Sequence, residues 1–219
     1  IFGLGYTAGR IATAMQAQAW QVRATGSAGD VAFANHGAVH AALGEATHIL
    51  SSVPPERAGG DPVLETYGEV LSGKALFYLS STGVYGDRAG AWVDEATPTI
   101  AQSGEGRRNA RAEADLAWLN MGARVFRLPG IYGPGRSALD RVKEGKARRI
   151  DLPDQVFSRV HVDDIEQRRD ESLWRWWIVE SLGERHGLDD EVVEVVKVIK
   201  ELFTFSNLRI WKCWQWGMC

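Results

Sequence analysis

Short apolar runs alternate with helical patterns along the first 166 residues of this chain, and this alternation limits its fold more than any other feature. The expected strands are Ile1–Gly3, Gln21–Ala24, Thr47–Val53, Ala75–Ser80 and Arg124–Leu128. The expected helices are Ala8–Gln18, Ala38–Leu43, Val63–Leu71 and Ala110–Leu119. Strand, helix and strand repeated in this order predict an α/β fold, in which helices cover both faces of a doubly wound parallel sheet. Ligands of such sheets bind beyond the carboxyl ends of the strands, so we look for the site there.

The composition narrows the class of partner. Hydrophobic residues make up 45% of the 219 residues and charged residues 24%, as in ordinary globular proteins. The formal net charge of −3 gives no electrostatic reason to expect nucleic acid or a membrane as partner. Neither a membrane-spanning apolar run nor a basic, then apolar, opening segment is present in the sequence, so we expect a cytoplasmic protein. Cys213 and Cys219 are the only cysteines, and we expect no disulfide framework and no metal site.

The two ends of the chain stand apart from this pattern. Six of the nine Trp residues follow residue 170, and Asp170–Gly183 and Asp189–Phe203 are expected helices. We therefore predict a domain of residues 1–166 and a short divergent helical segment of residues 167–219, which is either a reduced substrate lobe or a sequence foreign to the rest. The chain opens at Ile1 without Met, inside an expected strand, so we expect that strand to be clipped.

A glycine-rich turn follows the first expected strand. Gly3, Gly5 and Ala8 fit the G-x-G-x-x-G/A fingerprint of Rossmann-type domains, with Tyr6 and Thr7 between them. The first Gly allows the tight turn, the second lets the backbone approach a pyrophosphate, and Ala8 keeps the helix close to the strand. The phosphates would lie at the helix N-terminus, where free N–H groups point. This context favours dinucleotide binding over a plain structural turn.

The end of the second expected strand bears on the choice between NAD and NADP. An acidic residue about 20 residues after the glycines marks NAD. No carboxylate stands there, and Asp30 lies further along. Thr25 and Ser27 could hydrogen-bond a 2′-phosphate, whereas Arg23 is expected within the strand. NADP is therefore slightly favoured, with NAD as the alternative.

Six segments, in order, resemble the extended short-chain dehydrogenase/reductase superfamily and, more narrowly, the bacterial NAD(P)-dependent epimerase/dehydratase-like proteins. They are GLGYTAG, HILSSVPP, YLSSTGVYGD, WVDEATP, RLPGIYGPGR and RVHVDDI, within residues 1–166. The resemblance implies a Rossmann-type sheet, a nicotinamide dinucleotide, hydride transfer and often a nucleotide-linked sugar as substrate. After Ile165 the resemblance ends.

The resemblance also implies a catalytic set of one serine or threonine, one tyrosine and a lysine four residues after the tyrosine. Ser81 falls on the serine position, although a strand-end hydroxyl that caps a nearby N–H is an equal alternative. Counting back from Glu113 puts Glu105 at the tyrosine position and Asn109 at the lysine position, so both partners are missing. Tyr132 is a candidate acid from another direction, whereas Tyr85 is expected to be structural.

Further site residues follow from the resemblance. The loop after the strand Thr47–Val53 either covers the cofactor or only ends the strand, and it contains Ser52, Val53 and Pro54. Ser80 lies at the end of the next expected strand, Ala75–Ser80. The turn at Pro129, Gly130 and Ile131 would meet the nicotinamide. Thr82 and Arg136 would bind substrate, with a solvated loop arginine as the alternative for Arg136. His161, Asp163 and Asp164 are interpreted as structural rather than as metal ligands.

Two functions remain open at this point. The first is an NAD(P)-dependent oxidoreductase or epimerase that acts on a sugar-like or nucleotide-sugar substrate, and Ser81, Pro129 and Arg136 favour it. The second is a non-catalytic NAD(P)-binding or regulatory protein, which the missing tyrosine and lysine favour. We lean towards the enzyme, and a homodimer is left open.

Overall fold

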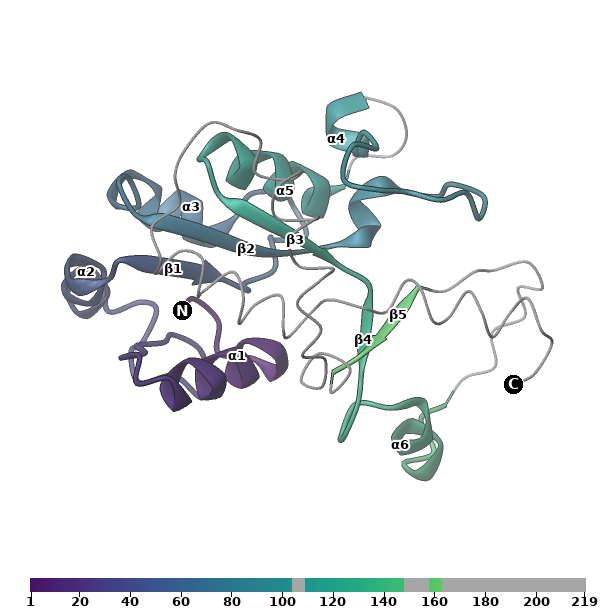
Figure 1. The fold of residues 1–219 in the computed structure, drawn as a ribbon, viewed down its shortest axis with the longest axis horizontal. Helices are drawn as coiled ribbons and strands as arrows, with labels where there is room; N and C mark the ends of the chain where they lie inside the picture. Colours follow the sequence, from purple (N-terminus) through teal and green to yellow (C-terminus); the bar gives the residue numbers. More distant parts are fainter. Residues whose placement is uncertain (104–108, 148–157, 163–219) are drawn as a thin grey trace. The chain divides into compact units, whose positions relative to one another are not determined.

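The computed structural model describes residues 1–103, 109–147 and 158–162, shown in colour in Figure 1. The described residues belong to two compact units: Ile1–Gly130 with Ser158, and residues 131–147 with 159–162. The predicted boundary at residue 166 and the predicted helices after it lie outside the described residues.

A parallel sheet forms the centre of the first unit. Its strands are β1 (His48–Ser51), β2 (Ala75–Ser81) and β3 (Arg124–Leu128), in that spatial order. In register, Ser51 lies beside Tyr78, and Ser80 lies beside Arg127. Because paired residues of parallel strands point to the same face, each pair shares one side of the sheet.

The first two expected strands are reduced to short parallel pairings at the edge of β1. The Phe2 N–H donates to the Leu50 carbonyl at 2.8 Å, and Phe2 forms a parallel bridge with Ser51. On its other side, the Leu4 N–H donates to the Thr25 carbonyl at 2.7 Å. These pairings are short because Gly3 and Gly26 leave the extended conformation, with φ of +82° and +115°.

The segment order shows where the sheet reverses. Val31 bridges Thr25 in parallel, so the spatial order is Val31, Thr25, Phe2, β1, β2 and β3. The chain therefore moves outward from Phe2 to Val31 and then returns to the opposite side of Phe2. This reversal is the mark of a doubly wound sheet, and ligands of such sheets bind at the reversal, which here lies between the ends of Phe2 and β1. The predicted α/β class is confirmed.

The four helices expected before β3 are present with shifted ends, whereas the short helix at Ile100–Ser103 and the 3₁₀ turn at Thr82–Tyr85 were not predicted. In chain order they are α1 (Tyr6–Ala17), α2 (His36–Glu45), α3 (Pro62–Tyr67), the 3₁₀ turns η1 (Gly68–Val70) and η2 (Thr82–Tyr85), α4 (Ile100–Ser103) and α5 (Ala110–Asn120). The helix expected over Val63–Leu71 is thus an α-helix followed by a 3₁₀ turn. Asn35, Asp61 and Asn109 start α2, α3 and α5, since the side chain of each accepts a backbone N–H of the first turn.

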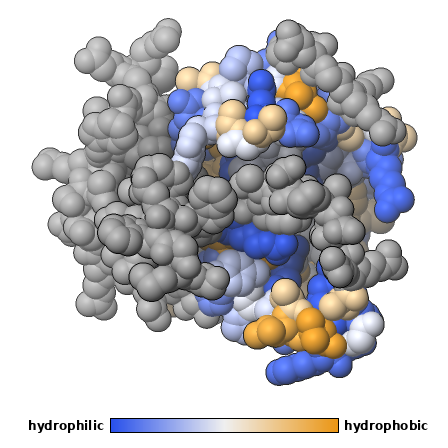
Figure 2. All heavy atoms as spheres, turned by 90° about the vertical axis from the view of Figure 1, so that its right-hand side faces the viewer, coloured by the Kyte–Doolittle hydropathy of each residue, from blue (hydrophilic) through white to orange (hydrophobic). Residues whose placement is uncertain are grey.

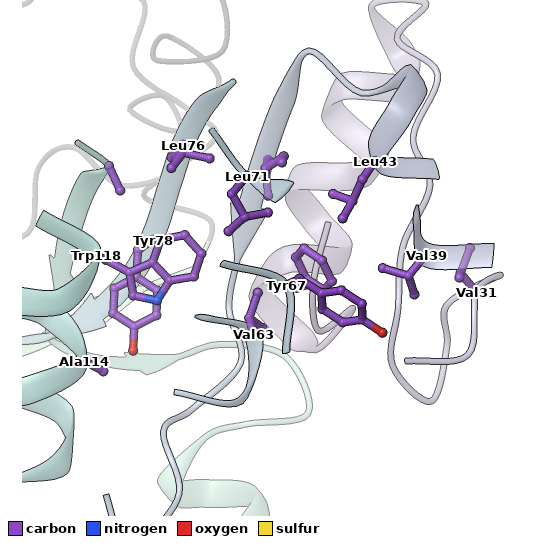
Figure 3. Packing of buried hydrophobic residues seen from close by; sticks show 13 residues of the cluster. Val31, Val39, Leu43, Val63, Tyr67, Leu71, Leu76, Tyr78, Ala114 and Trp118 are labelled. Carbon is purple, nitrogen blue, oxygen red and sulfur yellow. The ribbon is translucent and has the colours of Figure 1, made fainter. Parts of the chain in front are cut away.

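The helices cover both faces of the sheet. Figure 1 shows α1 on one side, and α3 and α5 on the other. The second side holds the main core, part of which is seen in Figure 3: Phe2, Val31, Val39, Leu43, Ile49, Val63, Tyr67, Leu71, Leu76, Tyr78, Ala114, Trp118 and Ala123. Trp118 stacks on Tyr78 with ring centroids 5.3 Å apart, and its indole N–H donates to Asp61 at 2.9 Å. These contacts attach α5 to both β2 and the start of α3.

The second unit holds α6 (Ala138–Lys143), β5 (Arg159–His161) and most of β4 (Gly130–Tyr132), which pairs with β5. A capping box between Ser137 and Asp140 starts α6. Leu139 and Val142 of α6 are strongly exposed. Figure 2 shows that orange, apolar residues stand among hydrophilic ones on the surface that it draws.

Candidate functional site

The turn after Phe2 is built so that only glycine fits at its first position. Gly3 has a φ of +82°, and a Cβ there would lie 3.0 Å from a Val53 methyl and 3.2 Å from the Ser52 hydroxyl. The Ser52 hydroxyl also donates to the Gly3 carbonyl at 2.6 Å. The end of β1 therefore packs directly against the glycine turn, at the edge where the sheet reverses.

Thr25 holds the same turn from the opposite side. Its hydroxyl is buried and accepts the Gly3 N–H at 3.1 Å. The next residue, Gly26, lies so close that a Cβ would be 2.8 Å from the Leu4 nitrogen. The structure thus turns the Thr25 hydroxyl towards the glycine turn, whereas Ser27 is exposed.

Gly5 differs from Gly3 because no contact with the described residues requires a glycine there. Its φ of −93° is open to any residue, and a Cβ would meet no atom within 4 Å. Gly5 is the N-cap of α1, and it offers no side chain to the N–H groups of the first turn. Ala8 is buried, so the helix lies close to the strand. Open space therefore lies directly before a helix N-terminus, where an anion is favoured.

Asp30 closes the loop that begins at Thr25. Its carboxylate accepts the Ala24 N–H at 2.7 Å and the Arg23 Nε–H at 2.5 Å. The hydrogen bond from Ala24, together with the one from Arg23, lowers the pKa of Asp30. Arg23 and Asp30 are thus engaged with each other, on the side where the second strand ends.

The Ser81 turn forms a second part of the site at the carboxyl end of β2. The half-buried Ser81 accepts the Gly83 N–H at 3.1 Å, so its hydroxyl caps η2, which starts at the half-buried Thr82. Asn109 donates to the Gly83 carbonyl at 3.0 Å and accepts the Arg111 N–H at 2.9 Å. The position counted for the lysine therefore lies beside the Ser81 turn. Glu105 lies outside the described residues.

Below Ser81 lies a buried polar network that the sequence analysis missed. The Ser80 hydroxyl donates to Asp115 at 2.7 Å, and Arg127 forms a bidentate ion pair with the same carboxylate at 3.1 and 2.9 Å. Hydrogen bonds to Asp115 and Tyr85 raise the pKa of Arg127 against the opposing effect of burial. One signal could have revealed Asp115: it lies between Ala112 and Trp118 at a spacing of three, on the buried stripe of α5.

The remaining predicted residues belong to the end of β3 or to the second unit. Pro129 and Gly130 follow β3 directly. In the second unit Tyr132 packs edge-on against His161, with ring centroids 4.9 Å apart, and Arg136 is exposed in a turn with Gly133. Ile131 precedes Tyr132 in β4. Asp163 and Asp164 lie outside the described residues.

Two further findings concern metals and membranes. Among residues 1–103, 109–147 and 158–162, no group of three or more His, Cys, Asp or Glu side chains could hold a metal ion. Within the same ranges, the helices are too short or too polar to cross a membrane.

Comparison with known proteins places the fold. A conserved protein of unknown function from Silicibacter pomeroyi is 36% identical, with a TM-score of 0.58 over 75% of this chain. A protein from Methylobacillus flagellatus, provisionally named an NAD-dependent epimerase/dehydratase, is 19% identical, with a TM-score of 0.54 over 94% of this chain and 82% of its own. The fold is Rossmann-like. The chain spans 63% of the Silicibacter protein, and no family model and no curated protein matches it.

Proposed function

We propose that this Rossmann-like chain binds a nicotinamide dinucleotide across the edge between Phe2 and β1. The observation that carries the proposal is the contrast between Gly3, which packing requires, and Gly5, which stands in open space at the N-terminus of α1. The first-turn N–H groups of α1 would hold the pyrophosphate. The residues proposed to contact the cofactor are Gly3, Gly5, Tyr6, Thr7, Ala8, Thr25, Ser27, Ser52, Val53, Pro54, Ser80, Pro129, Gly130 and Ile131.

We propose NADP rather than NAD as the cofactor. Asp30 is the nearest carboxylate after the second strand, and its oxygens already accept hydrogen bonds from Ala24 and Arg23. A carboxylate used in this way is poorly placed to bind both ribose hydroxyls of NAD. The exposed Ser27 supports the choice, since its hydroxyl can donate to a 2′-phosphate.

The reaction that we propose is hydride transfer with a sugar-like or nucleotide-sugar substrate. A bound nicotinamide supplies the hydride chemistry. The Ser81 hydroxyl, held in place by the Gly83 N–H, would orient a substrate hydroxyl. Thr82 and Arg136 would bind substrate, and Tyr132 is the candidate acid.

A second candidate is a non-catalytic dinucleotide-binding protein, and Asn109 favours it. Both polar atoms of its side chain are used, one on Gly83 and one on Arg111, so this position offers no proton shuttle. Turnover of a nucleotide-sugar panel with NADPH separates the two candidates, because only the enzyme oxidises NADPH or interconverts the sugars.

Calorimetric titration with NADPH and NADH tests the cofactor site. Gly5→Val fills the open space before α1 with a branched side chain, so we expect NADPH affinity to fall at least 100-fold. The helix start should lose about 1 kcal/mol, which leaves the protein folded. Gly44→Val is the matched control, because a Cβ at Gly44 on α2 also meets no atom within 4 Å. NADPH affinity that is unchanged in Gly5→Val would contradict the proposal, and tighter binding of NADH would contradict the choice of NADP.

A further inference from the structure

The Asp115 carboxylate is fully buried between β2, β3 and α5, and it accepts hydrogen bonds from two side chains. Ser80 of β2 donates at 2.7 Å, and Arg127 of β3 donates at 3.1 and 2.9 Å through two nitrogens. The third nitrogen of Arg127 donates to the Tyr85 hydroxyl at 3.0 Å. Tyr85 in turn donates to the Asp94 carbonyl at 2.8 Å. Asp115 and Arg127 together thus join the ends of β2 and β3 to the turn that follows β2.

Stability alone does not explain a buried ion pair. Removing two charges from water costs several kcal/mol for each ion, and well-packed apolar residues often serve the fold equally well. The pair does, however, fix geometry, because a bidentate arginine admits only one arrangement of the carboxylate. The location of the ion pair should therefore indicate which part of the structure its geometry holds in place.

The network lies directly under the Ser81 turn. Ser80 is in register with Arg127, and Ser81 is in register with Leu128. Tyr85 is the last residue of η2, whose first turn Ser81 caps. Pro129 comes directly after Leu128 in the chain. Loss of the guanidinium would release both the Ser81 turn and the start of the Pro129–Gly130 turn.

The strand order decides which half of a dinucleotide would lie over this network. The pyrophosphate belongs at α1, and the adenosine half extends towards the end of the second strand, at Thr25. Thr25 lies on one side of Phe2, and β1, β2 and β3 lie on the other. The nicotinamide half would therefore extend towards the ends of β1, β2 and β3, the strand that carries Arg127.

We propose that Asp115 and Arg127 are positioning residues that hold the Ser81 turn in the geometry that receives the nicotinamide half of the cofactor. The inference rests on the proposed function. It assigns to the pair a role in binding one end of the ligand, which is separate from a role in folding.

The test replaces the pair by apolar residues in the full chain, as Asp115→Leu with Arg127→Met. The thermal midpoint should stay within a few degrees of the wild type, because no charge is left buried alone. Titration with NADPH should show affinity lowered about tenfold. Titration with 2′,5′-ADP, which carries only the adenosine half, should show wild-type affinity. NADPH affinity that is unchanged, or that falls equally with that of 2′,5′-ADP, overturns the inference.

Two further variants separate the possible failures. Arg127→Lys keeps the charge but loses the bidentate geometry of the guanidinium, so it should show the same selective loss of NADPH affinity. It serves as the test variant if the double variant does not fold. Gly5→Val should lose both NADPH and 2′,5′-ADP, since it blocks the place of the 5′-phosphate that the two ligands share. If the wild type binds none of NADPH, NADH, 2′,5′-ADP and ADP, the proposed function and this inference are both overturned. A wild type that binds them, with Arg127→Lys unaffected at both ends, overturns the inference alone.

Discussion

At the scale of one residue, Asn109 shows which contacts an asparagine makes at the position where the resemblance places a lysine. Where the resemblance places a lysine, the Asn109 amide caps α5 and reaches the Gly83 carbonyl beside Ser81. The short side chain can do both because its acceptor and donor lie on one carbon. A lysine has three donors and no acceptor, so it could not cap the helix.

Asn109→Lys should therefore lower the free energy of unfolding by about 1–2 kcal/mol, because α5 loses its cap and Gly83 its partner. Asn109→Asp is the matched control, since it keeps the acceptor and loses only the contact with Gly83. Urea unfolding curves of the three proteins give the comparison. A lysine variant as stable as the wild type would show that the cap contributes nothing. The same loss of stability is expected in the double variant Glu105→Tyr with Asn109→Lys, which restores the tyrosine and lysine that the resemblance implies. The activities of this variant and the wild type should be compared at equal folded fraction.

The loop between Thr25 and Val31 shows how a short element is stabilised without a core of its own. Gly29 allows the chain to fold back, since a Cβ there would lie 2.3 Å from the Ala24 carbonyl oxygen. The Asp30 carboxylate then closes the loop onto Ala24 and Arg23. Because the ion pair with Arg23 needs the charge, and both oxygens accept hydrogen bonds best when the carboxylate is ionised, the stability of the loop depends on pH.

The pKa of Asp30 is lowered in the folded protein, first by the Ala24 N–H and then by Arg23. A lowered pKa means that this contribution to stability is present above the unfolded value of about 3.9. It is lost as the pH falls through the folded pKa, below about pH 4. We expect Asp30→Asn to flatten the acid side of the stability profile, measured as the urea midpoint from pH 3 to 6. Parallel profiles of the variant and the wild type would exclude this role for Asp30.

At the scale of the whole sheet unit, one apolar cluster joins the helices of one face to the strands, and Tyr78 of β2 belongs to it (Figure 3). Its ring stacks on Trp118, and its hydroxyl accepts a hydrogen bond from Arg111 at 3.0 Å. Burial raises the pKa of Tyr78 to about 12, against the opposing effect of Arg111. The core therefore favours the neutral phenol.

A raised pKa gives a contribution that is fully present below the unfolded value of about 10 and is lost as the pH rises towards the folded pKa. The wild type should lose roughly 2–3 kcal/mol of stability between pH 10 and 12 from this group, at about 1.4 kcal/mol for each pKa unit. Tyr78→Phe should be less stable at pH 8, because Arg111 loses its partner, but should lose less as the pH rises. Urea midpoints from pH 8 to 11 test this, and equal slopes in both proteins would be the contrary result.

The sequence by itself determined the alternation of helices with β1, β2 and β3 and the place of the glycine turn, whereas the pairing of Val31 with Thr25 was not predicted. These features are local, because apolar periodicity and a positive φ at Gly3 depend on neighbours in the chain. The class of fold follows from them, and the helix ends differ by a few residues where Asn35 and Asp61 act as caps.

The tertiary structure alone decided which side chains meet at the carboxyl edge. Ser80 and Asp115 are 35 residues apart, and Trp118 meets Asp61 across 57 residues. The chain pattern alone did not show that the Thr25 hydroxyl faces Gly3, or that the space before Gly5 is open. Each of these depends on which strands are neighbours and in which register they pair, because a shift of one residue between β2 and β3 would put Ser80 and Arg127 on opposite faces of the sheet.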